Sequence, residues 1–113
     1  MCNTSQLICT AAALAMAATT ALAQGNYPSK PITVIIPYDA GGGPDTIVRI
    51  VGEETVKELG QRFVIDNRPG GDTVIGSQAM TRAAPDGYTL LVVTGTHVIN
   101  PWMRKLPYDA IKD

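Results

Sequence analysis

A run of five β-branched residues, Ile32 to Ile36, constrains the fold of this chain more than any other part of its sequence. Pro37 closes the run, and a strand that is apolar on both faces is typical of the interior of a parallel sheet. A glycine-rich loop, Ala40 to Asp45, follows directly. From Thr46 to Leu59, apolar and charged residues then alternate at helical spacing. The segment therefore predicts a strand–loop–helix unit of an α/β fold.

The predicted helix Thr46–Leu59 has recognisable ends and an apolar side. Asp45 is the expected N-cap, and Gly60 is the expected stop in the C′ position. On the helix itself, the residues expected to face the sheet are Ile47, Ile50, Val51 and Leu59.

The same alternation continues along the chain. The sequence predicts a second strand, a second helix and a third strand at Arg62–Asp66, Val74–Ala84 and Tyr88–Val93. Strands that alternate with helices through short connections imply right-handed crossovers and a mostly parallel sheet with helices on both faces. After Thr94 we expect a polar loop, then a short helix near Trp102–Lys105 in which Trp102 packs against the domain.

The first residues are typical of an export signal. The chain carries no charged side chain before Lys30, and Ala21-Leu22-Ala23 follows an apolar stretch, with small residues where signal peptidase requires them. No Lys or Arg precedes that stretch, which is atypical, and a buried N-terminal helix is the alternative. We expect residues 1–23 to be a signal peptide and the mature chain to be periplasmic. Both cysteines, Cys2 and Cys9, would then be removed, which excludes a disulfide scaffold.

Charge and composition exclude several classes of function. The 9 basic and 10 acidic side chains are mixed along the chain, with no basic run that would bind nucleic acid. No cluster of metal ligands and no nucleophile–base signature of a hydrolase is present, so no cofactor is expected. The single histidine, His97, is interpreted as a hydrogen-bonding surface residue. A binding protein is favoured over an enzyme.

The loops 38–45, 67–74 and 94–100 follow the three predicted strands, and they are rich in Gly, Thr, Asn and Asp. In open α/β sheets, ligands bind at this carboxyl end. The first loop enters a helix N-terminus, which favours an anion, although its glycines could equally serve only tight turns. Gly41-Gly42-Gly43 lacks the spacing of a dinucleotide or phosphate loop. A carboxylate is the preferred anion, with Asp45 as a cap rather than a direct contact. Arg68 either binds a second carboxylate or pairs with Asp66.

Several blocks of the sequence resemble a known family in the same order. These blocks are Tyr27-Pro28-Ser29-Lys30-Pro31-Ile32, Ile36-Pro37-Tyr38, Gly41-Gly42-Gly43-Pro44-Asp45, Asn67-Arg68-Pro69-Gly70, Ile75-Gly76, Ala83-Ala84-Pro85-Asp86-Gly87-Tyr88-Thr89-Leu90, Gly95-Thr96-His97, Ile99-Asn100-Pro101 and Leu106-Pro107-Tyr108-Asp109. Together they resemble the opening of the tripartite tricarboxylate transporter receptors, the Bug or TctC-type solute-binding proteins.

The resemblance implies the N-terminal part of a two-lobed, periplasmic-binding-protein-like (type II) fold. Residues 24–113 would be an incomplete first lobe. The implied partners are a small carboxylate ligand and the membrane permease subunits of a tripartite transporter; after signal cleavage the chain would not be membrane-embedded. The implied ligand-binding residues are Tyr38, Gly42, Gly43, Asp45, Gly76, Thr94 and Thr96.

Two positions depart from the family pattern. Pro44 stands where a hydroxyl residue is common, which removes a backbone N–H and a side-chain donor from the first loop. Gly71-Asp72-Thr73 places an acid where a small, glycine-rich stretch is usual. The sequence does not name the carboxylate. The alternatives are a small flavodoxin-like or nucleotide-binding enzyme domain, and a nonfunctional gene fragment.

Overall fold

The computed structural model describes residues 27–112, so the predicted signal peptide at residues 1–23 lies outside the described residues. Three parallel strands form one sheet in the order β2-β1-β3. The strands are β1 (Ile32–Ile36), β2 (Phe63–Asn67) and β3 (Thr89–Leu91). The predicted parallel sheet is confirmed, with the β-branched run at its centre.

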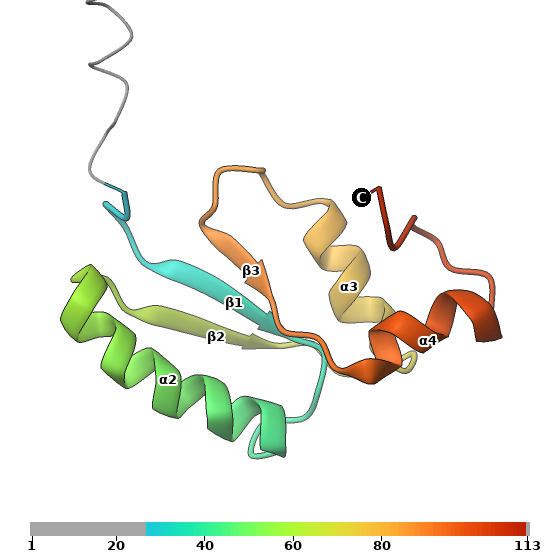
Figure 1. Ribbon diagram of the computed structural model, residues 1–113, viewed down its shortest axis with the longest axis horizontal. Helices are drawn as coiled ribbons and strands as arrows, with labels where there is room; N and C mark the ends of the chain where they lie inside the picture. The colour runs from blue at the N-terminus through green and yellow to red at the C-terminus, as the bar shows by residue number, and fades with distance from the viewer. Residues whose placement is uncertain (1–26, 113) are drawn as a thin grey trace, which may run out of the picture.

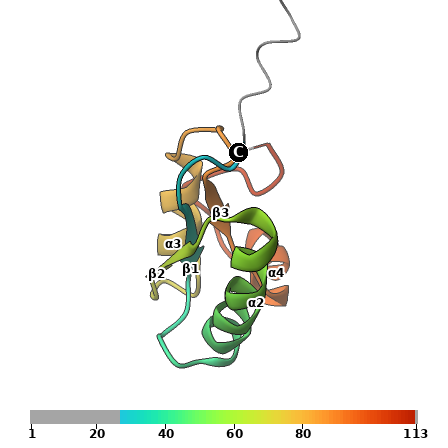
Figure 2. The same cartoon turned by 90° about the vertical axis from the view of Figure 1, so that its left-hand side faces the viewer.

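The two connecting helices lie on opposite faces of this sheet. Helix α2 (Gly43–Leu59) joins β1 to β2, and helix α3 (Val74–Thr81) joins β2 to β3. The chain moves first to one side of β1 and then to the other, so crossovers of the same hand place the helices on different faces. Figures 1 and 2 show this arrangement, with α4 (Gly95–Met103) following β3. The α/β architecture with helices on both faces is as the sequence predicts.

The core lies between β1 and α2. Val34, Ile36 and Val48 are buried, and partly buried side chains pack around them from Tyr38, Phe63, Ile65 and Val92. Ile36 is fully buried, as expected for the central strand. Burying each such side chain contributes about 1.5–3 kcal/mol, so this small cluster provides much of the apolar stabilisation on this face.

Helix α2 begins earlier than predicted. Its N-cap is Gly42 rather than Asp45, and Pro44 lies in the first turn. Proline suits this place because its fixed φ matches the helix and its missing N–H needs no partner there. At the other end Gly60 is left-handed, and its N–H donates to the Val56 carbonyl at 2.9 Å, which confirms the predicted stop.

The side of α2 that faces the sheet also differs from the prediction. Asp45, Val48 and Gly52 are buried, whereas Ile47 and Ile50 are 62% and 61% exposed. A Cβ at Gly52 would lie only 3.2 Å from the Phe63 ring, so the small residue lets the helix approach β2 closely. The apolar residues next to this contact side instead line an open groove, whose walls are Val34, Ile47, Val48, Val51, Phe63, Met80, Leu90, Leu91 and Val92.

The segment after β3 is helical where a polar loop was predicted. Helix α4 starts directly after Thr94 and contains Pro101. Of the short helix expected near Trp102–Lys105, only Trp102 and Met103 are helical, as the end of α4. Trp102 does not pack as predicted, because it is 89% exposed. Across residues 27–112, no helix combines the length and apolar character needed to cross a bilayer.

Candidate functional site

The loops that leave the three strands gather at one end of the sheet, beside the first turns of all three helices (Figure 1). A hollow of about 360 Å³ lies there between the first and second loops. It is lined by Pro37, Tyr38, Asp39, Gly42, Pro44, Pro69, Gly70, Asp72 and Thr73. Of the residues that the sequence singles out, Tyr38 and Gly42 line this hollow directly.

Asp45 lies beneath the first loop and is 1% exposed. Its Oδ2 accepts from the Gly41 N–H at 2.8 Å, and Arg49 donates to both carboxylate oxygens, at 2.9 and 3.1 Å. Asn67 donates to Asp45 Oδ1 at 3.1 Å and to the Tyr38 carbonyl at 3.2 Å. The carboxylate therefore joins the first loop, α2 and the end of β2, and its oxygens are occupied by protein donors.

These donors explain the acidity of Asp45. Hydrogen bonds from the Arg49 guanidinium and then from the Gly41 amide lower the pKa of Asp45 from 3.8 to about 2, against the opposing effect of burial. The pKa of Arg49 is raised by the same pair. Asp45 is therefore ionised at neutral pH, with its charge balanced inside its own helix.

Tyr38 connects the first loop to the third. Its hydroxyl is hydrogen-bonded to the Thr94 hydroxyl. Thr94 is the N-cap residue of α4, yet its side chain makes no capping hydrogen bond to the helix. The threonine oxygen that could satisfy the first amides of α4 is thus directed to the neighbouring loop.

Among the described residues, the helices α2, α3 and α4 all lack a side-chain hydrogen bond that caps the N-terminus. The first turn of a helix presents amides without intrahelical partners, and its dipole favours negative charge. Gly43 and Gly95 lie in such turns, and a Cβ at either would meet no atom within 4 Å. Thr96 is the next residue of α4 and is half-buried. The first amides of α3 are already used, because the Val74 and Ile75 N–H groups donate to the Gly71 and Gly70 carbonyls at 3.3 and 3.5 Å. The first turns of α2 and α4 are therefore the places from which this end of the sheet can donate backbone hydrogen bonds to an anion.

Gly76 lies next to the site rather than in its open part. A Cβ there would come within 2.6 Å of the Pro37 Cβ and 3.2 Å of the Arg68 carbonyl oxygen. Only glycine lets α3 approach the end of β1 this closely. The residue determines where α3 begins relative to the first two loops, and so shapes the site from behind.

Two asparagines that sequence reasoning did not propose as site residues are prominent in the structure. Asn67 supports the first loop, as described above. Asn100 is 2% exposed and donates from Nδ2 to the Asp72 carbonyl at 2.7 Å and to Thr73 Oγ1 at 3.3 Å. Both belong to blocks that resemble the family, but a single sequence does not reveal which distant loop an amide contacts.

The remaining polar candidates have partners within the protein. Arg68 donates to Asp66 at 2.8 Å, which is the simpler of the two roles considered for it. His97 Nδ1 lies 3.2 Å from the hydroxyl of Ser77, a residue that is 1% exposed. Between Tyr27 and Lys112, no three His, Cys, Asp or Glu side chains are grouped so that they could hold a metal ion.

Comparison with known proteins finds close relatives. A UPF0065 protein of Bordetella bronchiseptica is 44% identical over 102 residues, covering 88% of this chain and 30% of the relative. BugT of Bordetella pertussis is 36% identical over 90 residues, covering 77% of this chain and 28% of its own length. The chain thus spans about a third or less of the curated relatives that it matches.

Solved structures show the same similarity. A structure described as a periplasmic transporter is 47% identical, with a TM-score of 0.70 over 77% of this chain and 30% of that one. MatC from Rhodopseudomonas palustris with bound malate is 36% identical, with a TM-score of 0.67 over 74% of this chain and 29% of that one. An R. palustris protein with adipate is 29% identical, with a TM-score of 0.72 over 77% of this chain and 30% of that one.

The TM-scores show that the α/β fold described above is that of periplasmic binding proteins. The sequence profile of the tripartite tricarboxylate transporter family receptors, TctC, matches residues 47–113. This is a family of transport receptors, not of enzymes. The chain therefore belongs to the tripartite tricarboxylate transporter receptor family, as its sequence blocks predicted.

Proposed function

We propose that residues 24–113 belong to the incomplete first lobe of an extracytoplasmic receptor that captures a small carboxylate for a tripartite tricarboxylate-type importer. The observation that carries this proposal is the hollow of about 360 Å³ at the carboxyl end of the sheet, lined by residues at the N-termini of α2 and α3, neither of which has a side-chain cap. The N-terminus of α4, also without such a cap, is linked to this hollow through the hydrogen bond of Thr94 to Tyr38. The malate and adipate in two structural neighbours support a carboxylate as the ligand class.

The donors at this end are dipoles rather than cations. No Lys or Arg is among the residues that line the hollow, whereas Asp39 and Asp72 are. A carboxylate would therefore be held by the backbone amides of Gly43, Gly95 and Thr96, and by the linked hydroxyls of Tyr38 and Thr94. Gly42 lines the hollow, but its N–H already donates to the Asp39 carbonyl at 3.2 Å. Helix N-termini supply this kind of anion site without a basic side chain.

We expect the affinity of this chain alone to be low. A cleft receptor gains much of its affinity by enclosing most of the ligand surface. The hollow described here is lined by the first two loops alone, so a ligand would be covered on one side and exposed on the other. Binding of a dicarboxylate should have a Kd near or above about 1 mM, which corresponds to about 4 kcal/mol.

A titration followed by backbone amide NMR tests the proposal. Malate and adipate should shift the amides of Gly42, Gly43 and Gly95, whereas adipamide, a neutral analogue of the same shape, should not. Thr94→Val removes a hydroxyl and should weaken the response to adipate by about threefold or more, the effect of one lost hydrogen bond. Thr81→Val, which removes a hydroxyl at the far end of α3, is the matched control and should have no effect.

Two outcomes would contradict the proposal. Equal shifts with adipamide would show that charge plays no part in binding. Saturable shifts with ATP or a flavin nucleotide at the same loops would favour the nucleotide-binding alternative.

Export is the second part of the proposal. With Ala21 and Ala23 at the cleavage positions, the periplasmic chain should begin at Gln24, and mass spectrometry of the periplasmic fraction measures this directly. A full-length chain with an intact Met1 in the cytoplasm would contradict it. The membrane permease subunits are the proposed partners of the released receptor.

A further inference from the structure

The second loop of the site has an unusual backbone. Four consecutive residues are left-handed, with φ of 117° at Gly70, 57° at Gly71, 56° at Asp72 and 75° at Thr73. Glycine adopts such angles freely, but the Cβ of Asp72 and of Thr73 crowds the backbone there. Consecutive non-glycine residues persist in this conformation only where surrounding groups hold them.

Helix α4 supplies the groups that hold this loop. The Asn100 amide donates to the Asp72 carbonyl at 2.7 Å and to Thr73 Oγ1 at 3.3 Å. Arg104, just after the helix, donates to the Asp72 carboxylate at 2.8 Å and to the Gly71 carbonyl at 3.5 Å. Asn100 of α4 and Arg104, the C-cap residue of that helix, thus engage three successive residues of the loop.

Asn100 and Arg104, the two residues that hold this loop, differ in their surroundings. Asn100 is 2% exposed, so its amide loses water and must find protein acceptors. Arg104 has a side chain that is 44% exposed, and the Asp72 carboxylate that it binds is 53% exposed. Asn100 is therefore the buried anchor, while Arg104 balances an acidic charge at the rim of the hollow.

Helix α4 also reaches the other side of the site. Its N-cap residue, Thr94, is hydrogen-bonded to Tyr38 of the first loop. Gly70, Asp72 and Thr73 are wall residues of the hollow, and so is Tyr38. The helix is thus in contact with both walls, through Thr94 at its start and through Asn100 near its end.

We infer that Asn100 is a positioning residue for the ligand site. It holds residues 70–73 in the left-handed shape that forms one wall of the hollow, and it fixes that wall to α4. Arg104 assists by pairing with Asp72, so that one of the two carboxylates lining the hollow is charge-balanced. This inference rests on the proposed function only in taking the hollow as the place where ligand binds.

The test begins with Asn100→Asp in the otherwise unchanged chain. The substitution keeps the size of the side chain but replaces the donor by a carboxylate facing the Asp72 carbonyl. Hydrogen exchange of the amides of residues 70–75 should accelerate by about tenfold or more. Gln78→Glu, the same amide-to-acid change on neighbouring α3, is the matched control and should leave these amides unchanged.

A glycine rescue separates positioning from simple core packing. Asp72→Gly removes the crowding at a left-handed position, so the loop then needs less holding. In an Asp72→Gly background, Asn100→Asp should accelerate the exchange of residues 70–75 by less than about threefold. If the acceleration stays as large as in the parent chain, Asn100 only fills space and the inference is overturned.

Arg104→Gln provides an independent measurement should Asn100→Asp fail to fold. Because Arg104 lies at the surface, the chain should keep its unfolding midpoint while exchange accelerates at residues 71–73 alone. Unchanged exchange there would overturn the bracing role.

A carboxylate titration of the same variants completes the set. Asn100→Asp should weaken adipate binding by more than the accompanying change in the unfolding midpoint explains. If the parent chain binds no carboxylate, the proposed function fails, but the exchange results still decide whether Asn100 holds the loop.

Discussion

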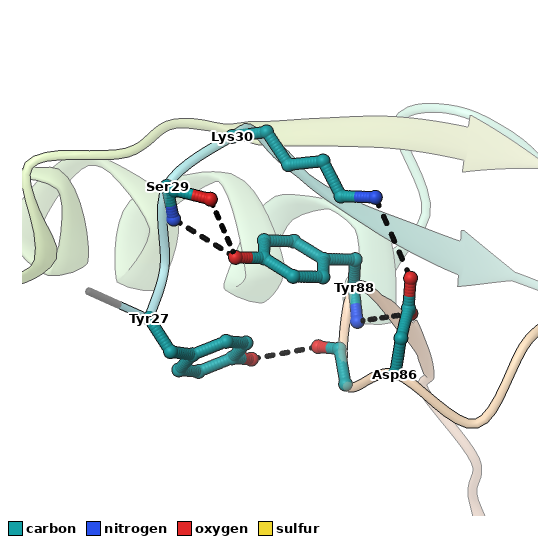
Figure 3. A network of polar contacts seen from close by, with 6 residues as sticks. Tyr27, Ser29, Lys30, Asp86 and Tyr88 are labelled. Atoms are coloured by element: carbon teal, nitrogen blue, oxygen red, sulfur yellow. Dashed lines mark hydrogen bonds and ion pairs between the residues drawn. The ribbon is translucent and has the colours of Figure 1, made fainter. Parts of the chain in front are cut away.

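The two ends of the sheet are built in opposite ways. At the amino end, the lead residues before β1 are bound to the turn before β3 by side chains that contact each other directly (Figure 3). Tyr27 donates to the Gly87 carbonyl at 2.7 Å, the Tyr88 hydroxyl accepts from the Ser29 N–H at 2.9 Å, and the two tyrosine rings pack edge-to-face at 5.0 Å.

Charge reinforces this amino-end contact. Lys30 lies 3.4 Å from the Asp86 carboxylate and 4.3 Å from the centre of the Tyr88 ring. Hydrogen bonds to the Ser29 side chain and N–H lower the pKa of Tyr88, and the Tyr88 amide lowers that of Asp86, with a smaller contribution from Lys30. The polar groups of this end satisfy one another.

At the carboxyl end, buried side chains bind the loops from the protein side, and the solvent-facing side of these loops has no such partners within residues 27–112. Asp45 and Asn100 lie beneath the loops, while the helices above them have no side-chain caps. The two ends therefore differ in function: at the amino end the side chains bind one another, whereas at the carboxyl end buried side chains fix the loops and leave the helix N-termini accessible. Substitutions should affect stability and binding differently at the two ends.

The largest expected effect is at the carboxyl end, from Gly76→Ala. The added Cβ would lie 2.6 Å from Pro37, and this contact involves rigid atoms at the end of β1. Overpacking of this kind costs about 1–3 kcal/mol or more, and chemical denaturation measures it. The matched control is Gly43→Ala, where a Cβ meets no atom within 4 Å and the change should stay within about 0.5 kcal/mol. Equal losses at both glycines would contradict the close approach of α3.

The second prediction concerns acid. Because the pKa of Asp45 is lowered from 3.8 to about 2 in the folded chain, the ionised carboxylate stabilises the fold above about pH 4. That stabilisation should disappear as pH falls toward 2, when the folded form is protonated. Urea unfolding between pH 7 and about 2 should show this loss in the parent chain and a much flatter profile in Asp45→Asn. An unchanged acid profile in Asp45→Asn would show that other carboxylates govern it.

The third prediction sharpens the contrast from the amino end. Tyr27→Phe removes the hydrogen bond to Gly87 but keeps the ring packing against Tyr88. The free energy of unfolding should fall by about 0.5–1 kcal/mol, and adipate binding should be unaffected. A loss of binding without a loss of stability would mean that the two ends are coupled and do not act separately.

The smallest expected effect is that of Lys30→Met. The ion pair with Asp86 is exposed on both sides, so water and salt weaken it. The loss of stability should be the smallest of the four and should vanish at about 1 M salt, where screening acts within about 3 Å. A loss that persists in high salt would assign the contribution of Lys30 to its contact with the Tyr88 ring instead.

Those parts of the fold that depend on local pattern could be predicted from the sequence. The β-branched run gave β1 its place, and Gly60 ended α2 because a left-handed stop is a local property. Helix α4 was missed because Gly95 and Pro101 both disfavour helix when considered alone. The prediction of which side of α2 is buried was wrong, because burial depends on the neighbouring strand. Gly52 approaches Phe63 closely, and the periodicity of apolar residues does not indicate this contact.

The candidate site shows the same division. Its location followed from topology, since parallel strands bring their carboxyl ends together. Its internal contacts did not, because Tyr38 meets Thr94 across 56 positions and Asn100 meets Asp72 across 28. Which polar side chain supports which loop depends on the final packing of helices, and no spacing in the sequence encodes it.

The central place of β1 has a consequence for how the chain becomes ordered. Every strand pairing in this sheet includes β1, because β2 and β3 both bind to it and not to each other. Because the chain is synthesised from its N-terminus, β1 is made before β2 and β3, and it stays unpaired until both partner strands are available. Its two edges are covered one after the other, first by residues 63–67 and later by residues 89–91. During that interval an unpaired β-branched strand is open to pairing with other chains, so a low concentration of nascent chains should favour correct assembly.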